Sequence, residues 1–346
     1  MSRALVIRLG GIGDNLVASS VLPLLRRDHE VDVMAQDPQS CVFEHNPYVS
    51  RLISKREGDI PSGDNGAQWH AWMRDRGGEY DFWVNLSHSC ETKLALFRNE
   101  TAFWWPVEFR RRICGHNYLE YVHDLCGVAH EFDPGPRFYP TNTERNKADD
   151  TLNQVRGTPP RPVVGIAISG SRLDKIWPYL PMLVVRLLGE LDVRVVLFGA
   201  GERDHKMALH VQDFVKLWRG SLDGLHAAIS PDPTAPSWPI RRALATLRQC
   251  DLVLTPDTGL AWAVAMEALP KVVLLSHASA ENITRHWVNT TTLHADPIRV
   301  PCYPCHRLHD DATTCVKAED AEASKCMADI ALDTVFAAVR DNMKGH

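Results

Sequence analysis

The chain has no long hydrophobic run and no strong excess of charge of one sign. No apolar stretch approaches the roughly 18 residues that a membrane-spanning helix needs, and the first residues lack the charged and apolar regions of a secretory signal. The formal net charge is −5 over 346 residues, which gives no general attraction to nucleic acid or to an anionic lipid surface. These absences favour a globular protein without a membrane span, and we expect it in the cytoplasm.

Aromatic residues are also few, at 8%, while apolar residues in total reach 45%. At this length the composition predicts about two domains, each large enough to bury its own core. One basic cluster, Arg110 to Arg112, stands out locally from the acidic total. A short run of this kind is usually a solvated or substrate-facing patch.

Short apolar runs alternate with amphipathic stretches, which is the βαβ rhythm of a parallel sheet. In the first half, strands are predicted at residues 5–9, 31–34, 80–86 and 103–107, and helices at 15–27 and 118–127. In the second half, strands are predicted at 163–168, 193–198, 215–218, 252–255 and 271–275, and helices at 180–191, 241–249 and 260–269. Each half opens with a strand and a glycine-bearing turn. This pattern predicts an α/β protein with two Rossmann-like parallel-sheet domains facing one another across a cleft.

Proline interrupts the pattern at residues 133–146 and 158–162, and we expect the domain boundary there. The predicted organisation is a Rossmann-like domain over residues 1–157, a second over 158–300, a cysteine-rich segment over 301–327 and a C-terminal helix over 328–346. A further proline-rich stretch at 230–239 is interpreted as a surface insertion.

Residues 5–15, LVIRLGGIGDN, form the most informative stretch, because an apolar strand runs into a glycine-rich turn and a carboxylate before a helix. The turn contains Gly10, Gly11, Gly13 and Asp14. Such a turn presents backbone N–H groups and one acid at the carboxyl end of a strand, where open α/β sheets bind ligands. The simpler alternative is a tight βα turn whose aspartate caps the helix.

Three loops of the second half have the residue types of an anion and nucleoside site. The first offers hydroxyl and backbone donors and a point charge, from Ser169, Gly170, Ser171 and Lys175. The second offers close approach and an acceptor for ribose hydroxyls, from Gly199, Gly201 and Glu202. The third offers free N–H groups at a helix start, from Asp257, Thr258, Gly259 and Leu260. Each loop alone could be an ordinary turn or cap, but together they would surround a nucleoside diphosphate.

Four of the 9 cysteines, Cys302, Cys305, Cys315 and Cys326, lie in the C-terminal segment with the spacing C-x2-C-x9-C-x10-C. Four thiolates at such spacing fit a tetrahedral zinc or iron site. Closed coordination by four sulfurs leaves no position for a substrate, so we expect a structural role. The alternative is a set of four thiols that bind no metal.

An acceptor-side site is expected in the first half of the chain. His88 follows the strand predicted at residues 80–86, and its loop should face the cleft. Gly11 and Gly13 complete this acceptor-side set, since their turn lies at the end of the first strand.

Four segments, in this order, resemble glycosyltransferase family 9, the ADP-heptose:lipopolysaccharide heptosyltransferases and their relatives. They are RLGGIGD, SGSRLDKIWP, VVLFGAGERD and CDLVLTPDTGLAWAVA. The resemblance covers most of the chain and implies the GT-B fold, with an N-terminal acceptor domain and a C-terminal nucleotide-sugar donor domain. It also implies that Asp14 is the catalytic base, that Lys175 binds donor phosphate and that the Asp257-Thr258-Gly259 turn holds the diphosphate.

The resemblance implies an inverting glycosyltransferase. It would transfer a heptose or related sugar from a nucleotide-activated donor, in the first place an ADP-sugar, to a hydroxyl of a glycan, lipid or protein. No divalent metal is expected at the chemical step, because Lys175 and the helix start would stabilise the leaving diphosphate. Trp262 stands where the family usually has a histidine, which leaves the identity of the donor open. Cysteine-bound iron occurs in the autotransporter heptosyltransferases, so iron and zinc both stay open.

Two other functions fit part of the pattern. The arginines at 110–112 permit glycosyl transfer onto modified nucleic-acid bases, although the acidic net charge argues against it. A catalytically silent subunit that binds a nucleotide-sugar is the other alternative. The tryptophans at 69, 72, 104 and 105 are more often core or interface residues than platforms for sugars. A homo-oligomer is compatible with the sequence.

Overall fold

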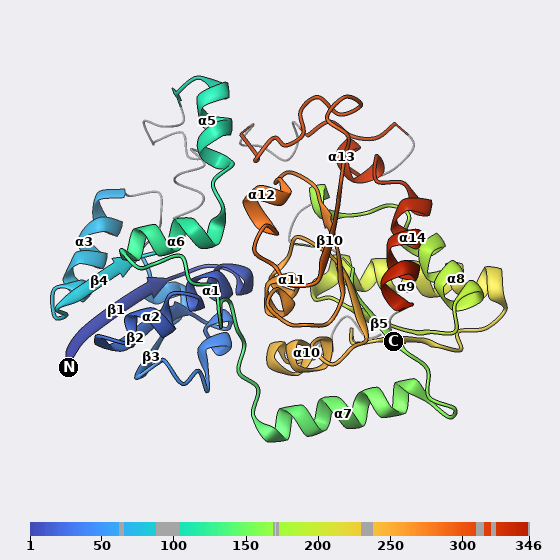
Figure 1. Ribbon diagram of the computed structural model, residues 1–346, viewed down its shortest axis with the longest axis horizontal. Helices are drawn as coiled ribbons and strands as arrows, with labels where there is room; N and C mark the ends of the chain where they lie inside the picture. Colours follow the sequence, from blue (N-terminus) through green and yellow to red (C-terminus); the bar gives the residue numbers. More distant parts are fainter. Residues whose placement is uncertain are drawn as a thin grey trace. The chain divides into compact units, whose positions relative to one another are not determined.

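The computed structural model describes residues 1–61, 66–87, 104–168, 170, 173–229, 238–308, 315–319 and 323–344. The chain divides into two compact units, Met1–Thr141 (unit 1) and Asn142–His346 (unit 2). Figure 1 shows that each unit is built around a sheet with helices beside it. Both sheets are parallel, as the βαβ rhythm predicts.

The sheet of unit 1 has the strand order β3-β2-β1-β4. Its strands are β1 (Ser2–Arg8), β2 (His29–Gln36), β3 (Arg51–Lys55) and β4 (Phe82–Asn85). Val6 of β1 is in register with Val33 of β2 and Val84 of β4. The last five residues of β1 are buried, which is the continuous burial of a central strand in a parallel sheet.

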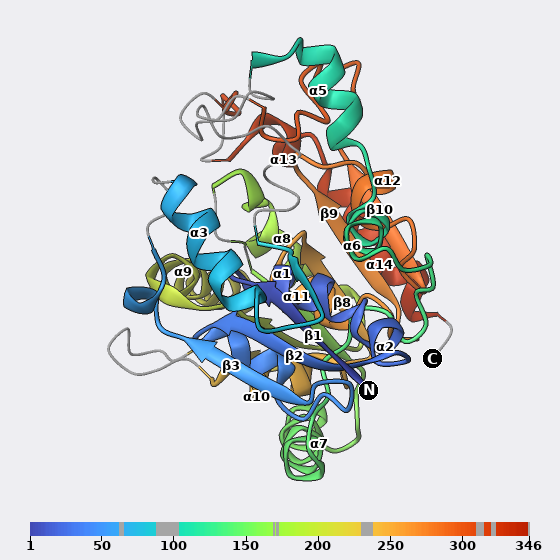
Figure 2. The same ribbon diagram turned by 90° about the vertical axis from the view of Figure 1, so that its left-hand side faces the viewer.

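The helical segments of unit 1 are α1 (Ile12–Ser19), α2 (Leu22–Leu25), η1 (Gln39–Phe43), η2 (Glu57–Asp59), α3 (Gly66–Gly77), α5 (Val107–Cys114) and α6 (Tyr118–Cys126). Trp69 and Met73 of α3 pack with Leu5 and Ile7 of β1. Figure 2 shows α3 beside the sheet in a second view. Alternate residues of β1 therefore form one core layer with α3.

Two predicted elements of unit 1 are wrong. The single helix expected at residues 15–27 is two helices, α1 and α2, and Pro23, which has no N–H to donate, lies in the first turn of α2. The strand expected at 103–107 is not formed, because Val107 begins helix α5 directly after Pro106. Residue 103 lies outside the described residues. The helix ending at Gly127 is confirmed, with Gly127 at a φ of 64° as its left-handed C-cap.

The sheet of unit 2 has the order β10-β9-β8-β5-β6-β7. Its strands are β5 (Val163–Ala167), β6 (Arg194–Phe198), β7 (Leu225–Ala227), β8 (Leu252–Pro256), β9 (Lys271–Leu275) and β10 (Thr290–His294). Helices cover both of its faces. Val164 of β5 belongs to the core layer formed with α8 (Leu180–Glu190), α9 (Gly201–Arg219) and α14 (Leu332–Met343), and Val163 to the layer formed with α7 (Asn142–Arg156) and α10 (Ile240–Leu247). This is the doubly wound arrangement that a parallel sheet requires.

Three short helices complete unit 2, α11 (Gly259–Val264), α12 (Ala280–Ile283) and α13 (Lys325–Ala328). The strand predicted at 215–218 is wrong, because these residues are the last turn of α9. Val215 is buried and Leu217 and Trp218 are exposed, so the apolar run is the edge of a helix. Residues 230–237 of the proline-rich insertion lie outside the described residues.

The division between the units lies at Thr141 and Asn142. This division lies within the proline-rich segment 133–146, but it comes before the end of the first domain predicted at residue 157, and the difference is helix α7. Leu152 and Val155 of α7 are buried in the core of unit 2, and Glu144 of α7 pairs with Arg241 of α10 at 2.6 Å. Packing of the amphipathic face of α7 therefore decides to which unit it belongs.

The C-terminal part of unit 2 continues from β10 into a segment that carries the cysteines. We call its described residues, 301–308, 315–319 and 323–330, the cysteine arm. Within it, Lys317 and Ser324 form an antiparallel bridge. The C-terminal helix expected at 328–346 is α14, Leu332–Met343, which packs on α8. Among the described residues, no helix combines the length and the apolar character needed to cross a membrane.

Candidate functional site

Asp14 lies in the first turn of α1, directly beyond the end of β1. One carboxylate oxygen is 2.8 Å from Nη2 of Arg8, and the other accepts a hydrogen bond from the backbone N–H of Gly11 at 2.9 Å. The Asp14 side chain is 36% exposed, whereas that of Arg8 is 4% exposed. The carboxylate is therefore held on two sides and open to solvent on a third.

Glycine is required in this turn for two reasons. Gly10 has a φ of 135°, which side-chain-bearing residues rarely adopt, and a Cβ atom at Gly10 or Gly11 would lie 3.1 or 3.2 Å from the Asp14 carboxylate. The turn thus wraps closely around the acid. The sequence identified the acid and the glycines but missed Arg8, because an arginine inside an apolar strand gives no sign of its partner.

In unit 2, Lys175 and Asp257 form a buried pair. Lys175 Nζ donates to the Asp257 backbone carbonyl at 2.6 Å and to its carboxylate at 3.2 Å. The two side chains are 14% and 11% exposed. Lys175 ends the short helix η4 (Leu173–Lys175), which follows β5, and Asp257 follows β8, a direct neighbour of β5 in the sheet. Two of the three predicted loops are therefore brought together at the carboxyl edge of the sheet, where α/β proteins bind ligands.

Gly170 makes room for this lysine. A Cβ atom at Gly170 would lie 2.5 Å from Cδ of Lys175, so only glycine lets the lysine side chain cross the loop. Ser169 and Ser171, which the sequence also predicted for this loop, lie outside the described residues.

A buried histidine joins this cluster from the next strand. His277 follows β9, is 6% exposed, and has Nδ1 at 3.3 Å from a carboxylate oxygen of Asp174. Burial is the largest influence on the pKa of His277 and lowers it below the usual value. Sequence reasoning missed Asp174 and His277. The one signal available in the sequence was their position in loops that follow strands β5 and β9.

The charge of Asp257 is maintained despite its burial. Burial alone would raise the pKa of its carboxyl, but the charges of Lys175 and His277 and the hydrogen bonds from Lys175 and Trp262 outweigh burial and lower the pKa. Trp262 is 4% exposed and packs edge-on against Trp287 at 4.8 Å between ring centroids. The residue that replaces the expected histidine is thus a buried donor to Asp257.

The third predicted loop contains a satisfied helix cap. Thr258 is the N-cap of α11 and its hydroxyl accepts from the N–H of Ala261 at 3.4 Å. Gly259 and Leu260 form the first turn of this helix. The cap interpretation therefore describes Thr258, and the charge at this edge comes mainly from the Lys175 and Asp257 pair.

The second predicted loop is tied internally. A Cβ atom at Gly199 would lie 2.7 Å from the carboxylate of Asp204, and the same carboxylate accepts from the N–H of Ala200 at 2.8 Å. Gly201, at a φ of 80°, begins α9. Glu202 is 74% exposed and pairs with Lys206 at 2.6 Å. Glu202 is thus accessible to solvent, while Asp204 fixes the turn.

The structure adds little on the other residues predicted for the acceptor side. His88 lies outside the described residues, and Gly13 belongs to α1.

In the basic cluster, Arg110 is 5% exposed, so only Arg111 and Arg112 present their charge to solvent. This weakens the case for a nucleic-acid surface on these arginines.

The four cysteines differ in exposure. Cys302 is exposed, Cys305 and Cys315 are half-buried and Cys326 is buried, and none of them forms a disulfide. Burial is the main cause that raises the pKa of the Cys326 thiol to about 12, and the hydrogen bond with the Ser324 hydroxyl acts in the opposite direction. The chemistry of the four cysteines suits zinc or iron. Within the described part of the chain, however, no group of three or more metal-binding side chains is arranged around a single point.

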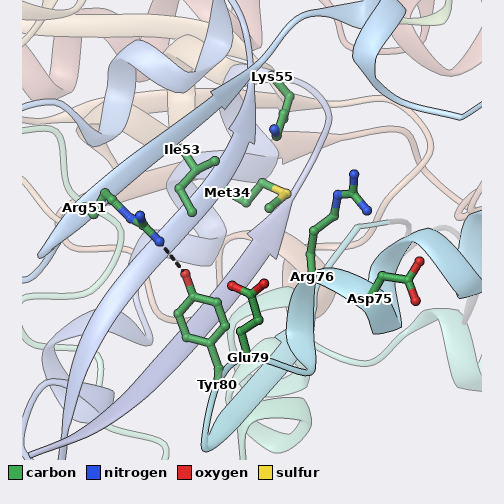
Figure 3. Close-up of a pocket in the computed structure, with 8 residues that line it drawn as sticks. All are labelled: Met34, Arg51, Ile53, Lys55, Asp75, Arg76, Glu79 and Tyr80. Atoms are coloured by element: carbon green, nitrogen blue, oxygen red, sulfur yellow. Dashed lines mark hydrogen bonds between the residues drawn. The ribbon is translucent and has the colours of Figure 1, made fainter.

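Unit 1 also has a hollow of about 420 Å³, which Figure 3 shows with its lining residues. These are Met34, Arg51, Ile53, Lys55, Asp75, Arg76, Glu79 and Tyr80. Arg51 is neutralised by Asp32 at 3.0 Å and donates to the Tyr80 hydroxyl at 2.8 Å. The hollow contains none of the predicted site residues, and its mixture of charges favours no one class of ligand.

Solved structures of known proteins share this architecture. A family 9 glycosyl transferase from Veillonella parvula is 16% identical, with a TM-score of 0.69 and coverage of 100% of this chain and 98% of that one. The E. coli ADP-heptose LPS heptosyltransferase II is 17% identical, with a TM-score of 0.61 and coverage of 99% and 98%. The iron-containing dodecameric heptosyltransferase TibC of E. coli, in complex with ADP-D-β-D-heptose, is 14% identical, with a TM-score of 0.53 and coverage of 99% and 77%.

The sequence matches no protein-family model and no curated protein. The structural likenesses extend over the whole chain at low identity, and they establish the fold. The two-sheet α/β architecture expected from the resemblance to family 9 is confirmed.

Proposed function

We propose that the chain is an inverting glycosyltransferase that uses a nucleotide-activated sugar, with an ADP-linked heptose or related sugar as the first candidate donor. The observation that carries the proposal is the buried Lys175 and Asp257 pair at the carboxyl edge of the unit 2 sheet. Its support from comparison is the fold, which is that of solved glycosyltransferases, two of them named for ADP-heptose.

The donor would bind in unit 2. Two donor protons of the Lys175 ammonium are used by Asp257, and an ammonium has three, so one is left for a phosphate oxygen. His277, held beside Asp174, adds a side chain that can donate or accept at the same edge. Glu202 at the start of α9 is an exposed acceptor suited to ribose hydroxyls. These residues together suit a nucleoside diphosphate better than a neutral ligand.

Asp14 of unit 1 would be the general base. In a single displacement, the acceptor oxygen attacks the anomeric carbon, the bond from that carbon to the diphosphate breaks, and the diphosphate leaves with the electron pair. Asp14 accepts the proton of the attacking hydroxyl and later releases it to solvent. Each carboxylate oxygen of Asp14 already accepts one bond but has a further lone pair, so the acid remains able to accept the proton.

The leaving diphosphate gains negative charge as the bond breaks. Lys175 is already in place before the donor arrives, because Asp257 and the crossing at Gly170 fix its side chain. A preorganised cation of this kind stabilises developing charge without rearrangement. The acceptor is a hydroxyl of a glycan, lipid or protein, and the proposed compartment is the cytoplasm.

A structural metal is proposed for the cysteine arm. Cys302, Cys305, Cys315 and Cys326 would hold zinc or iron through four thiolates, which suits a closed site that supports folding. The purified chain is expected to carry about one equivalent of zinc or iron by elemental analysis. A double Cys302→Ser, Cys305→Ser variant should lose it, and a wild-type chain with no bound metal would contradict this assignment.

The function is tested by cleavage of candidate donors. The purified chain is incubated with ADP-heptose, UDP-glucose and GDP-mannose, and release of each nucleoside diphosphate is followed, since water can replace the acceptor slowly. Release of ADP from ADP-heptose alone supports the proposal. Cleavage of another donor alone would retain the enzyme class and discard the heptose, and cleavage of none by a chain that binds nucleotides would favour the silent subunit.

A further inference from the structure

We propose that the cysteine arm positions the donor site of unit 2, because it holds the two loops that carry Lys175 and His277. The loop after β5 carries Asp174 and Lys175, and the loop after β9 carries His277. The ligand named here, a nucleoside diphosphate, rests on the proposed function. The contacts between the arm and the loops do not.

The arm contacts the first loop at three points. The Ser324 hydroxyl donates to the backbone carbonyl of Asp174 at 3.3 Å. Farther along the same loop, the Trp177 indole N–H donates to the Ile330 carbonyl at 2.9 Å. The Tyr179 hydroxyl donates to the Ala328 carbonyl at 3.1 Å.

Two of these three contacts are made by buried side chains. Trp177 and Ser324 are each 4% exposed, so water does not replace the partners that they would lose. The segment from Asp174 to Tyr179 is therefore fixed along its length by residues of the arm.

The arm contacts the second loop at two further points. The backbone N–H of His306 donates to the His277 carbonyl at 2.8 Å. The Tyr303 hydroxyl donates to the carbonyl of Ala278 at 3.0 Å, and Tyr303 is 7% exposed. Both contacts come from the turn that contains Cys302 and Cys305, so the position of this turn sets the position of His277.

The thiols lie within the same contacts. The Ser324 hydroxyl that reaches Asp174 is also 3.3 Å from the sulfur of Cys326. Tyr303 stands between Cys302 and Cys305 in the sequence, and His306 directly follows Cys305. A change at the sulfurs would therefore act on the residues that hold Asp174 and His277, rather than on a remote part of the unit.

The test removes the two hydroxyl contacts and keeps the rest of each side chain. A Tyr303→Phe, Ser324→Ala double variant of the full chain is compared with wild type and with Tyr48→Phe, a matched control whose tyrosine lies in unit 1. Hydrogen exchange of backbone amides is measured first, without any ligand. We expect faster exchange in residues 174–179 and 276–279 of the double variant, and unchanged exchange in β5, β8 and β9.

The affinity for ADP is then measured by calorimetry on the same proteins. We expect binding by the double variant to be about tenfold weaker, equivalent to about 1.4 kcal/mol, because the loops that carry Lys175 and His277 are less fixed, while the melting temperature shows a folded protein. Unchanged exchange in both loops would overturn the inference. Faster exchange with unchanged ADP affinity would also overturn it, since the arm would then be structural only.

Failure of the proposed function gives a different result. If the loops exchange faster in the double variant but wild type binds no nucleoside diphosphate, the arm does hold the loops and the proposed donor is wrong.

Discussion

The two units hold their charged side chains in place in different ways. In unit 1, Asp14 is held by the adjacent strand and turn, through Arg8 and Gly11, and stays partly open to solvent. In unit 2, Lys175 is held by Asp257, which comes from a loop 82 residues away, and both are buried. A group that must exchange protons with a substrate benefits from exposure, whereas a group that must hold a fixed charge benefits from burial and a partner.

The largest effect on the rate of sugar transfer is expected from Asp14. Asp14→Asn keeps the shape of the side chain and removes the base, so transfer is expected to fall by roughly a hundred- to ten-thousand-fold. ADP binding should not change, because the donor residues belong to unit 2. The rate of sugar transfer, or of donor cleavage, is compared with that of Asp28→Asn, an exposed aspartate of the same unit. Equal rates in the two variants would remove Asp14 from the mechanism.

The free energy of unfolding is expected to depend more on Asp257 than on Asp14, which is the reverse of the order expected for the rate of transfer. Asp257→Asn leaves the buried Lys175 without its counter-charge and is expected to lower the free energy of unfolding by about 3 kcal/mol. Asp14→Asn is expected to cost less, because solvent reaches the Asp14 side chain and the Arg8 guanidinium also donates to the Leu9 carbonyl. Urea denaturation of both variants measures the difference. A larger loss for Asp14→Asn than for Asp257→Asn would show that the burial of the pairs does not set their contribution.

Lys271, a second buried lysine of unit 2, is expected to make the free energy of unfolding depend on pH. Lys271 begins β9, and Nζ donates to the carbonyls of Glu267 and Leu269 at 2.7 and 2.8 Å. Burial lowers the pKa of Lys271 from 10.5 to about 8. Between these values the unfolded chain binds the proton and the folded chain does not, so the free energy of unfolding rises with pH.

The measurement is the slope of unfolding free energy against pH from 8 to 10. Wild type is expected to exceed Lys271→Met in this slope by up to about 1.4 kcal/mol per pH unit, the limit for one proton. Parallel curves for the two proteins would show that Lys271 does not release its proton in this range.

The smallest effect on stability is expected from Asn15 in unit 1. Asn15 follows Asp14 and is fully buried, and within the described residues neither polar atom of its carboxamide has a hydrogen-bond partner. Since an unpaired buried amide costs stability, Asn15→Leu is expected to leave unfolding unchanged or to stabilise unit 1 by about 1 kcal/mol. Thermal unfolding checks this. A loss of several degrees would indicate that the amide has a partner, such as a bound water, in solution.

Local signals in the sequence predicted the parts of the site that depend on one turn. The strand, glycine turn and acid from Leu5 to Asp14 are correctly placed, because the strand pattern and Gly10 are read within a few residues. The strand-end positions of Lys175 and Asp257 follow from the same kind of signal. Their pairing depends on β5 lying beside β8, which only the assembled sheet determines.

The errors have a common physical origin in packing over long distances. The apolar run at 215–218 has the composition of a short strand, and its helical state is decided by the face that α9 packs onto the core. Asp174 and His277 carry no motif, and they become neighbours only through sheet order. The assignment of α7 to unit 2 depends on its contact with α10 in the same way.

Lys175 is the residue through which unit 2 is proposed to bind a nucleoside diphosphate. This role is measured by calorimetric titration of wild type, Lys175→Met and the exposed-lysine control Lys216→Met with ADP, UDP, GDP and CDP. We predict selective binding of ADP by wild type and Lys216→Met, and at least tenfold weaker binding by Lys175→Met, since one charge-assisted contact is lost. Equal binding by Lys175→Met and wild type, or no nucleotide bound by any of the three, would contradict a donor site at Lys175.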